Sequence, residues 1–193
     1  MARTGTVQLA ARIWARDASL WTSSGEDRWL GWLDEPVRAR EHLGRLKEFA
    51  DAVAADGLSE VVLLGMGGSS LAPEVLRRTV KSTQFHVLDT THPAAISTLA
   101  ESLDLERTLF LVSSKSGTTL ETRCLLDYFW ARAGEQCDRF AAITDPGTRL
   151  EQLARERGFR DVFAGEPEIG GRFSALSLFG LVPAALLRVD LDA

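Results

Sequence analysis

The stretch EVVLLGMGGSSLAPEVL, residues 60–76, decides the fold of this chain. It begins with a short aliphatic run, which is typical of a strand buried on both faces of a sheet. Glycines then allow a tight turn, and serines stand where a helix would begin. The sequence therefore predicts a strand over 60–65, a loop over 65–70 and a helix over 71–80.

The same alternation continues along the chain. Further runs that predict strands are QFHVLD (84–89), TLFLVS (108–113), RFAAIT (139–144) and FRDVFA (159–164). The stretches of helical length that follow them are 93–103, 118–133, 147–157 and a largely apolar one at 174–187. Strands that are apolar on both faces and separated by helices form a parallel sheet covered on both sides. We therefore expect an α/β fold, a three-layer αβα sandwich with a five-stranded parallel sheet.

The residues before the first strand form a separate region. The segment PVRAREHLGRLKEFADAVAADG, residues 36–57, carries apolar residues at helical spacing and ends on Gly57, a favoured residue at helix C-termini. A long amphipathic helix is therefore expected to follow an N-terminal arm and to pack on the domain. We divide the chain into this helical arm with its helix, residues 1–57, and the α/β domain, residues 58–193.

Composition excludes several classes of protein. The chain has 193 residues, of which 45% are hydrophobic and 25% charged, and its net charge is −5, as in soluble globular domains. An acidic chain is a poor nucleic-acid binder, and the apolar runs are too short to span a bilayer. No signal peptide is recognised, and Cys124 and Cys137 lack metal-ligand spacing. We therefore expect a reduced, cytoplasmic protein with no nucleic-acid partner, no membrane partner and no metal.

Two loops qualify as ligand sites, because ligands of open parallel sheets bind beyond the carboxyl ends of the strands. The loop over 65–70 offers a glycine backbone that can approach a ligand closely. The loop SSKSGTT, residues 113–119, offers hydroxyls, the Lys115 ammonium and the amides of the next helix. Together these groups predict an anion site, with phosphate as its usual occupant. The alternative is an ordinary helix N-cap with polar neighbours.

Familiar nucleotide motifs fit these loops poorly. A Walker A loop needs a glycine before its lysine, whereas in SSKSGTT the lysine comes first. A dinucleotide fingerprint needs a third glycine where GMGGSS has Ser70, although Asp89 stands at a distance suited to a ribose. The sequence therefore favours a phosphate site of another kind.

A third stretch, IGGRFSALS at 169–177, carries an arginine between a glycine pair and the start of an apolar helix. The guanidinium of Arg172 suits an oxyanion, such as a phosphate or an enediolate. A surface arginine beside a capped helix is the alternative reading of the same residues.

These stretches carry a family resemblance. GMGGSSLAPEVL (65–76), SSKSGTTLET (113–122) and IGGRFSALSLFGLVPAAL (169–186) resemble, in the same order, motifs of the phosphoglucose isomerase family, specifically the N-terminal sugar-isomerase (SIS) domain of its members. The sequences of residues 11–22 and 31–36 are most similar to the isomerase part of fused transaldolase/glucose-6-phosphate isomerases. The resemblance implies a flavodoxin-like SIS fold, and a transaldolase domain fused or adjacent to it.

The resemblance also implies roles for individual residues. The family's phosphate-binding positions fall on Ser114, Lys115, Ser116 and Thr119, which would hold the 6-phosphate of a hexose. The sequence departs from the family at Ser116 and Gly117, where the commonest isomerases have Thr-Phe, and this widens the range of substrates.

The remaining family positions imply sugar contacts and catalysis. Gly68 and Ser69 match the Gly-Ser pair that contacts the sugar, and Arg172 matches the arginine that stabilises the enediolate. The implied activity is the interconversion of glucose 6-phosphate and fructose 6-phosphate in glycolysis and gluconeogenesis, by a homodimer with no cofactor.

The family's general base lies in a second SIS domain, which has no counterpart among the residues matched here. We therefore expect the 193-residue chain to bind a sugar phosphate and to be inactive alone. Two alternatives stay open at this point. One is a non-catalytic SIS module that senses a phosphosugar, and the other is an SIS isomerase of another sugar phosphate.

Overall fold

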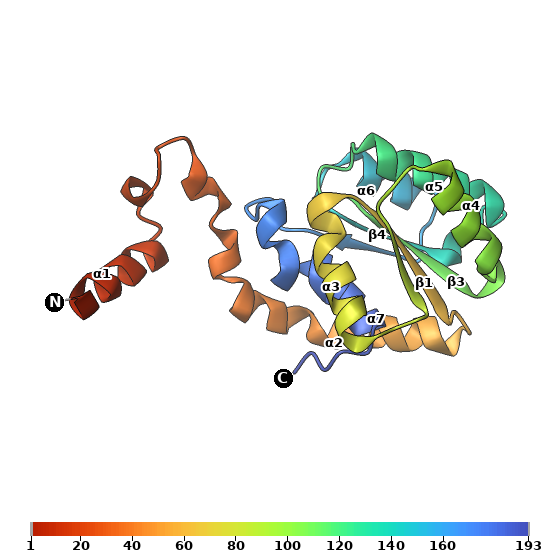
Figure 1. Ribbon diagram of the computed structural model, residues 1–193, viewed down its shortest axis with the longest axis horizontal. Coiled ribbons are helices and arrows are strands. Elements are labelled where there is room, and N and C mark those ends of the chain that lie inside the picture. Colours follow the sequence, from red (N-terminus) through yellow and green to blue (C-terminus); the bar gives the residue numbers. More distant parts are fainter. Residues whose placement is uncertain (1, 193) are drawn as a thin grey trace.

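The computed structural model describes residues 2–192 of the chain, with side chains from residue 7 onward. Five parallel strands form one sheet in the order β2-β1-β3-β4-β5 (Figure 1). The strands are β1 (Glu60–Gly65), β2 (Phe85–Leu88), β3 (Thr108–Ser113), β4 (Phe140–Thr144) and β5 (Asp161–Ala164). Each lies within the range that its apolar run predicts.

The helices form a layer on each face of this sheet (Figure 1). On one face lie α2 (Glu35–Ala55) and α7 (Leu178–Leu186), with α3 (Leu71–Val80) packed beside α7. On the other lie α4 (Pro93–Ser102), α5 (Leu120–Arg132) and α6 (Arg149–Glu156). The prediction of a three-layer αβα sandwich with a five-stranded parallel sheet is confirmed.

The central strand explains why both faces need a helix layer. Every residue of β3 is buried, and its side chains alternate between the two cores. Leu109 and Leu111 pack in the core under α2 and α7, whereas Phe110 and Val112 pack in the core under α4, α5 and α6. A strand with apolar residues on both faces is stable only when each face is covered.

The strand order creates a topological switch between β1 and β3. The chain moves from β1 outward to β2, and then returns to place β3 on the opposite side of β1. Gly65 pairs with Ser113 at the carboxyl ends of these strands, so the loops that follow β1 and β3 leave the sheet side by side. Ligands of open α/β sheets bind at such a switch point.

The N-terminal arm consists of α1 (Ala2–Trp14) and three 3₁₀ turns, η1 (Ala18–Leu20), η2 (Glu26–Trp29) and η3 (Gly31–Leu33). Helix α1 projects away from the domain, and none of its described side chains is buried (Figure 1). The chain returns to the domain at Leu30, which forms an isolated antiparallel bridge with Ile169. The arm therefore contacts the segment that leads to Arg172.

The remaining 3₁₀ turns are η4 (Gly67–Ser69), η5 (Leu105–Arg107), η6 (Cys137–Arg139) and η7 (Gly171–Leu176). Between residues 2 and 192, no helix combines the length and the apolar character that a membrane crossing requires.

The prediction of one continuous helix over 174–187 is wrong. The structure has η7, then an extended Ser177, then α7. The Ser177 hydroxyl donates to Ser174 O at 2.7 Å and accepts from Phe179 N at 3.4 Å, so it ends one element and caps the next. Serine is a favoured N-cap, and this signal lies inside the apolar run.

Candidate functional site

A cleft of about 520 Å³ opens at the carboxyl edge of the sheet, over the ends of β1 and β3. The predicted site residues that line it are Gly68, Ser69, Lys115, Ser116 and Thr119. The folded chain therefore brings together two loops that lie about fifty residues apart in the sequence. Neither Ser114 nor Arg172 belongs to the described lining of this cleft.

The loop after β1 is in direct backbone contact with the segment that carries Arg172. A Cβ atom on Gly68 would lie 2.5 Å from the carbonyl oxygen of Gly171. The Ser174 hydroxyl lies 2.7 Å from Gly171 O and 3.2 Å from Gly68 O, so it donates to the two carbonyls on either side of this contact. The close approach requires glycine at position 68.

The loop after β3 presents hydroxyls to the cleft. Ser114 is buried, and its hydroxyl donates to Thr119 Oγ1 at 3.2 Å. Ser116 Oγ accepts from the backbone N–H of Thr118 at 3.3 Å. Gly117 has φ +65° and packs so closely on Thr148 that an added Cβ would lie 2.6 Å from Thr148 Cβ. The turn therefore fixes the positions of the hydroxyls that flank it.

The side chain of Thr119 favours the anion-site interpretation of this loop over an ordinary N-cap. It occupies the N-cap position of α5, but among the described residues its side chain makes no capping hydrogen bond. The amides of the first turn of α5 therefore donate no hydrogen bond to the Thr119 hydroxyl, as they would in an ordinary N-cap. Unconsumed amides at a helix start, beside short hydroxyls, form an anion site.

Lys115 occupies a different position from these hydroxyls. Its ammonium donates to Asp145 Oδ2 at 2.6 Å and to Glu166 O at 2.8 Å, and it lies 3.5 Å from Pro167 O. Asp145 directly follows β4, and the two carbonyls follow β5. The side chain therefore crosses from the loop after β3 to two neighbouring loops.

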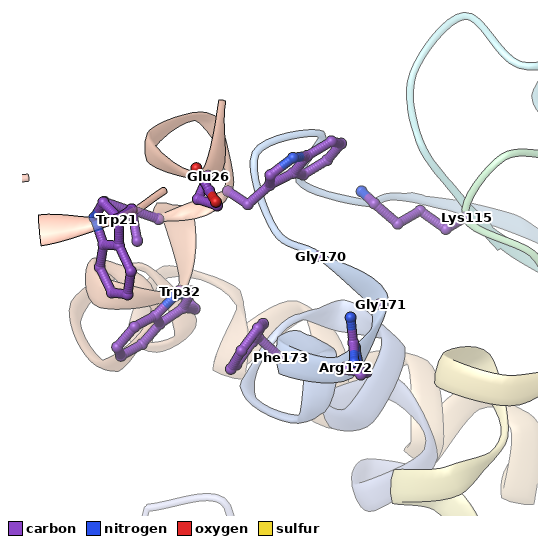
Figure 2. Close-up of a pocket in the computed structure, with 10 residues that line it drawn as sticks. Trp21, Glu26, Trp32, Lys115, Gly170, Gly171, Arg172 and Phe173 are labelled. Atoms are coloured by element: carbon purple, nitrogen blue, oxygen red, sulfur yellow. The ribbon is translucent and has the colours of Figure 1, made fainter. Parts of the chain in front are cut away.

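Arg172 faces a second cavity, of about 500 Å³, beside the first (Figure 2). Residues of the arm and of η7 form most of the walls of this second cavity. Trp32 from the arm stacks on Phe173 from η7, with ring centroids 5.7 Å apart. Trp29, Lys115 and Gly171 line both cavities. The two cavities are therefore neighbouring parts of one site.

Sequence reasoning missed Trp29 and Asp145, which both line the cleft. Asp145 follows a predicted strand directly, so the rule that selected the loops after β1 and β3 could have found it. Trp29 belongs to the arm, and no local pattern in the sequence connects it with this edge of the sheet. Asp145 also carries an oxygen, Oδ1, that is buried without a hydrogen-bond partner among the described residues.

A charged cluster supports the segment behind the cleft. Arg38 Nη1 lies 2.6 Å from Glu166 Oε2 and 4.0 Å from Glu35 Oε1. Glu35 is only 3% exposed, and its Oε1 has no hydrogen-bond partner among the described residues. Burial raises the pKa of Glu35 above its usual value of 4.5, with further upward contributions from Glu166 and Asp34, while Arg38 opposes the shift.

Glu35→Gln is expected to stabilise the domain at neutral pH by about 1 kcal/mol, because a neutral amide is easier to bury than a carboxylate whose cation, Arg38, lies 4.0 Å away and makes no hydrogen bond to it. The folded-state pKa is raised, so the contribution of Glu35 to stability is most favourable below pH 4.5 and is lost as the pH rises through the folded-state value. The gain should therefore vanish in acid. Urea unfolding as a function of pH measures it. Glu48→Gln, at an exposed position of the same helix, should give no gain at either pH.

The fold and the site together define a doubly wound α/β domain with a cleft at its topological switch point. Residues 35–190 match the family model described as phosphoglucose isomerase. The chain belongs to the phosphoglucose isomerase family.

Individual relatives agree with this assignment. The chain is 39% identical over 171 residues to a glucose-6-phosphate isomerase of Thermus thermophilus, a match that covers 85% of this chain and 40% of that protein. A crystal structure of a hypothetical protein from Thermus thermophilus superposes with a TM-score of 0.82 at 34% identity, over 99% of this chain and 46% of the other.

A crystal structure of a glucose-6-phosphate isomerase from Chlamydia trachomatis gives a TM-score of 0.67 at 30% identity, over 76% of this chain and 29% of the other. The chain thus spans about 40% of the length of the curated relatives that it matches first.

Proposed function

We propose that this chain forms the hexose-6-phosphate-binding part of a glucose-6-phosphate isomerase. The observation that carries the proposal is the loop over 113–119, where Ser116 and Thr119 line a cleft at the switch point and the Thr119 side chain makes no capping hydrogen bond to α5. The relative from Thermus thermophilus, whose match covers 85% of this chain, is named glucose-6-phosphate isomerase.

In the proposed complex, the 6-phosphate accepts hydrogen bonds from Ser116, Thr119 and the amides of the loop. Ser114 contributes by orienting the Thr119 hydroxyl, to which its own hydroxyl donates. Gly68 and Ser69 contact the sugar from the loop after β1. Arg172, which lines the neighbouring cavity, stabilises the negative charge of an enediolate, because a guanidinium attracts an oxyanion more strongly than a neutral carbonyl.

The reaction moves a proton from C2 to C1 of the open-chain sugar through that enediolate and needs no cofactor. The proton acceptor is proposed to come from outside the cleft lining. Among the described residues the lining includes one carboxylate, Asp145, and its Oδ2 accepts from Lys115 while its Oδ1 is buried. A carboxylate so engaged is a poor general base.

The proposal extends to features of the complete protein. We propose that the protein forms a homodimer and is cytoplasmic. We also propose that the chain divides into the helical arm with its helix, residues 1–57, and the α/β domain, residues 58–193. A transaldolase domain fused or adjacent to this chain stays a prediction. The tight packing of Gly117 on Thr148 gives a structural reason for a glycine there, so the departure from Thr-Phe does not by itself require a different substrate.

Calorimetric titration of the 193-residue chain with fructose 6-phosphate and with fructose tests the proposal. Only the phosphorylated sugar should bind. Ser116→Ala and Thr119→Val should each weaken binding at least about tenfold, the size expected when a hydrogen bond to a charged group is lost. Ser102→Ala, at an exposed hydroxyl of α4, should have no effect. Equal binding of the two sugars would refute the phosphate assignment.

A further inference from the structure

The Lys115 ammonium is already engaged by the protein. An ammonium carries three N–H donors, and three oxygens surround this one: Asp145 Oδ2 at 2.6 Å, Glu166 O at 2.8 Å and Pro167 O at 3.5 Å. The pair is also sheltered, since the Lys115 and Asp145 side chains are 22% and 16% exposed. A phosphate that took this ammonium would displace a short ion pair and leave a largely buried carboxylate without its cation, which is strongly unfavourable.

The oxygens that hold Lys115 belong to the segment that carries the arginine. Figure 2 shows the Lys115 side chain reaching from its loop towards the backbone that leads to Gly170 and Gly171. The same segment, residues 165–172, continues into the contact between Gly171 and Gly68. Lys115 therefore connects three segments: its own loop, residues 113–119, which we call the phosphate loop, the loop after β4, and the segment 165–172 that carries Arg172.

The arm and the start of α2 also hold this segment. Gly31 N donates to Glu168 O at 3.1 Å, Leu30 bridges Ile169, and Arg38 contacts Glu166 through the ion pair described above. Residues 165–169 are thus fixed between the arm and Lys115. Removal of either support should loosen the segment without removing any hydroxyl of the phosphate loop.

We propose that Lys115 is a positioning residue, with Asp145 as its partner, and that the pair fixes the segment 165–172 against the phosphate loop. The phosphate is then held by the hydroxyls of Ser116 and Thr119 and by the amides of the phosphate loop, and the Lys115 ammonium makes no direct bond to it. Asp145 becomes a functional residue of the site because it orients Lys115. This inference rests on the proposed function only for the identity of the ligand.

Amide hydrogen exchange of the ligand-free chain tests the positioning role. Lys115→Met and Asp145→Ala should each speed exchange in residues 165–170 at least about tenfold, because each removes a charged hydrogen bond. The double variant should be no faster than Lys115→Met alone, because removal of the lysine abolishes all three contacts and Asp145 acts only through that lysine. Exchange in α6 is the internal reference. Unchanged exchange at 165–170 in the single variants would overturn the proposal.

Titration with fructose 6-phosphate separates this role from that of a direct ligand. If Lys115 bound the phosphate, Asp145→Ala would free the ammonium, remove a competing anion and tighten binding. The positioning role predicts weaker binding in Asp145→Ala and recovery in Asp145→Asn, whose amide oxygen still accepts from the ammonium. Tighter binding in Asp145→Ala would overturn the proposal. The exchange experiment needs no ligand, so a wild-type chain that binds no sugar phosphate refutes the proposed function and leaves the positioning role decided by exchange.

The salt dependence of the same titration gives an independent check. A lysine that pairs with phosphate contributes to the decline of affinity with salt, because salt screens the attraction. Lys115→Met should therefore weaken binding of fructose 6-phosphate while leaving the slope of log Kd against log salt unchanged. A flatter slope in this variant would show that the ammonium contacts the phosphate and would overturn the proposal.

Discussion

Replacing Gly68 by alanine is expected to weaken hexose 6-phosphate binding about ten- to 100-fold, because the strain of the added methyl group, about 1–3 kcal/mol, falls on a loop that contacts the sugar in the proposed complex. The new Cβ would lie 2.5 Å from Gly171 O and 2.9 Å from Gly171 Cα, and backbone atoms cannot rotate away as a side chain can. The two segments must then separate, and we expect a loss of about 1–3 kcal/mol in the free energy of unfolding. Titration with fructose 6-phosphate and urea unfolding measure the two effects.

Gly171→Ala is the matched control, because it adds the same methyl group to the other side of the same contact. Its Cβ would lie 3.8 Å from Gly68 Cα, an ordinary van der Waals distance. We expect its stability and affinity to stay close to those of the wild type. Similar losses in both variants would mean that the contact between the two loops is not the cause.

Gly117→Ala should produce the second large loss, because it combines a steric and a conformational penalty. The alanine Cβ would lie 2.6 Å from Thr148 Cβ, and a left-handed φ of +65° costs a non-glycine residue about 1–2 kcal/mol. The turn that sets Ser116 and Thr119 should move away from the loop after β4. We expect binding of fructose 6-phosphate to fall at least about tenfold, with a stability loss larger than the conformational cost alone.

Gly147→Ala isolates the conformational part of this effect. Gly147 has φ +76°, and no other described atom would lie within 4 Å of its added Cβ. This variant should lose about 1–2 kcal/mol of stability and keep its affinity for the sugar phosphate. If Gly147→Ala lost affinity to the same degree, the close packing of Gly117 on Thr148 would not be what positions the phosphate loop.

Local sequence patterns predicted most of the architecture. The predicted ranges 60–65, 71–80 and 108–113 coincide with β1, α3 and β3. These elements are strongly patterned, because a strand buried on both faces must be apolar throughout and a helix needs a defined start and end. The helix over 174–187 failed because an apolar run shows burial but does not show where hydrogen bonding changes from one element to the next.

The candidate site was predictable in part. The loops that contain Gly68, Ser116 and Thr119 could be selected because parallel strands place their carboxyl ends along one edge of the sheet. The sequence could not show that Trp29 from the arm completes the cleft wall, or that Arg172 faces the neighbouring cavity. Both facts depend on how the arm packs, and the arm has no periodic pattern that fixes its partner.

The sequence by itself determined the class of fold, the positions of both ligand loops and the family resemblance, because periodicity, capping and turn residues act over short distances along the chain. Only the tertiary structure decided what the charged groups do. Lys115 and Glu166 lie 51 residues apart in the sequence, and the carbonyl that binds the ammonium is a backbone atom that every residue possesses. No sequence pattern marks such an acceptor, so the role of Lys115 follows from the packing of three loops at one edge of the sheet.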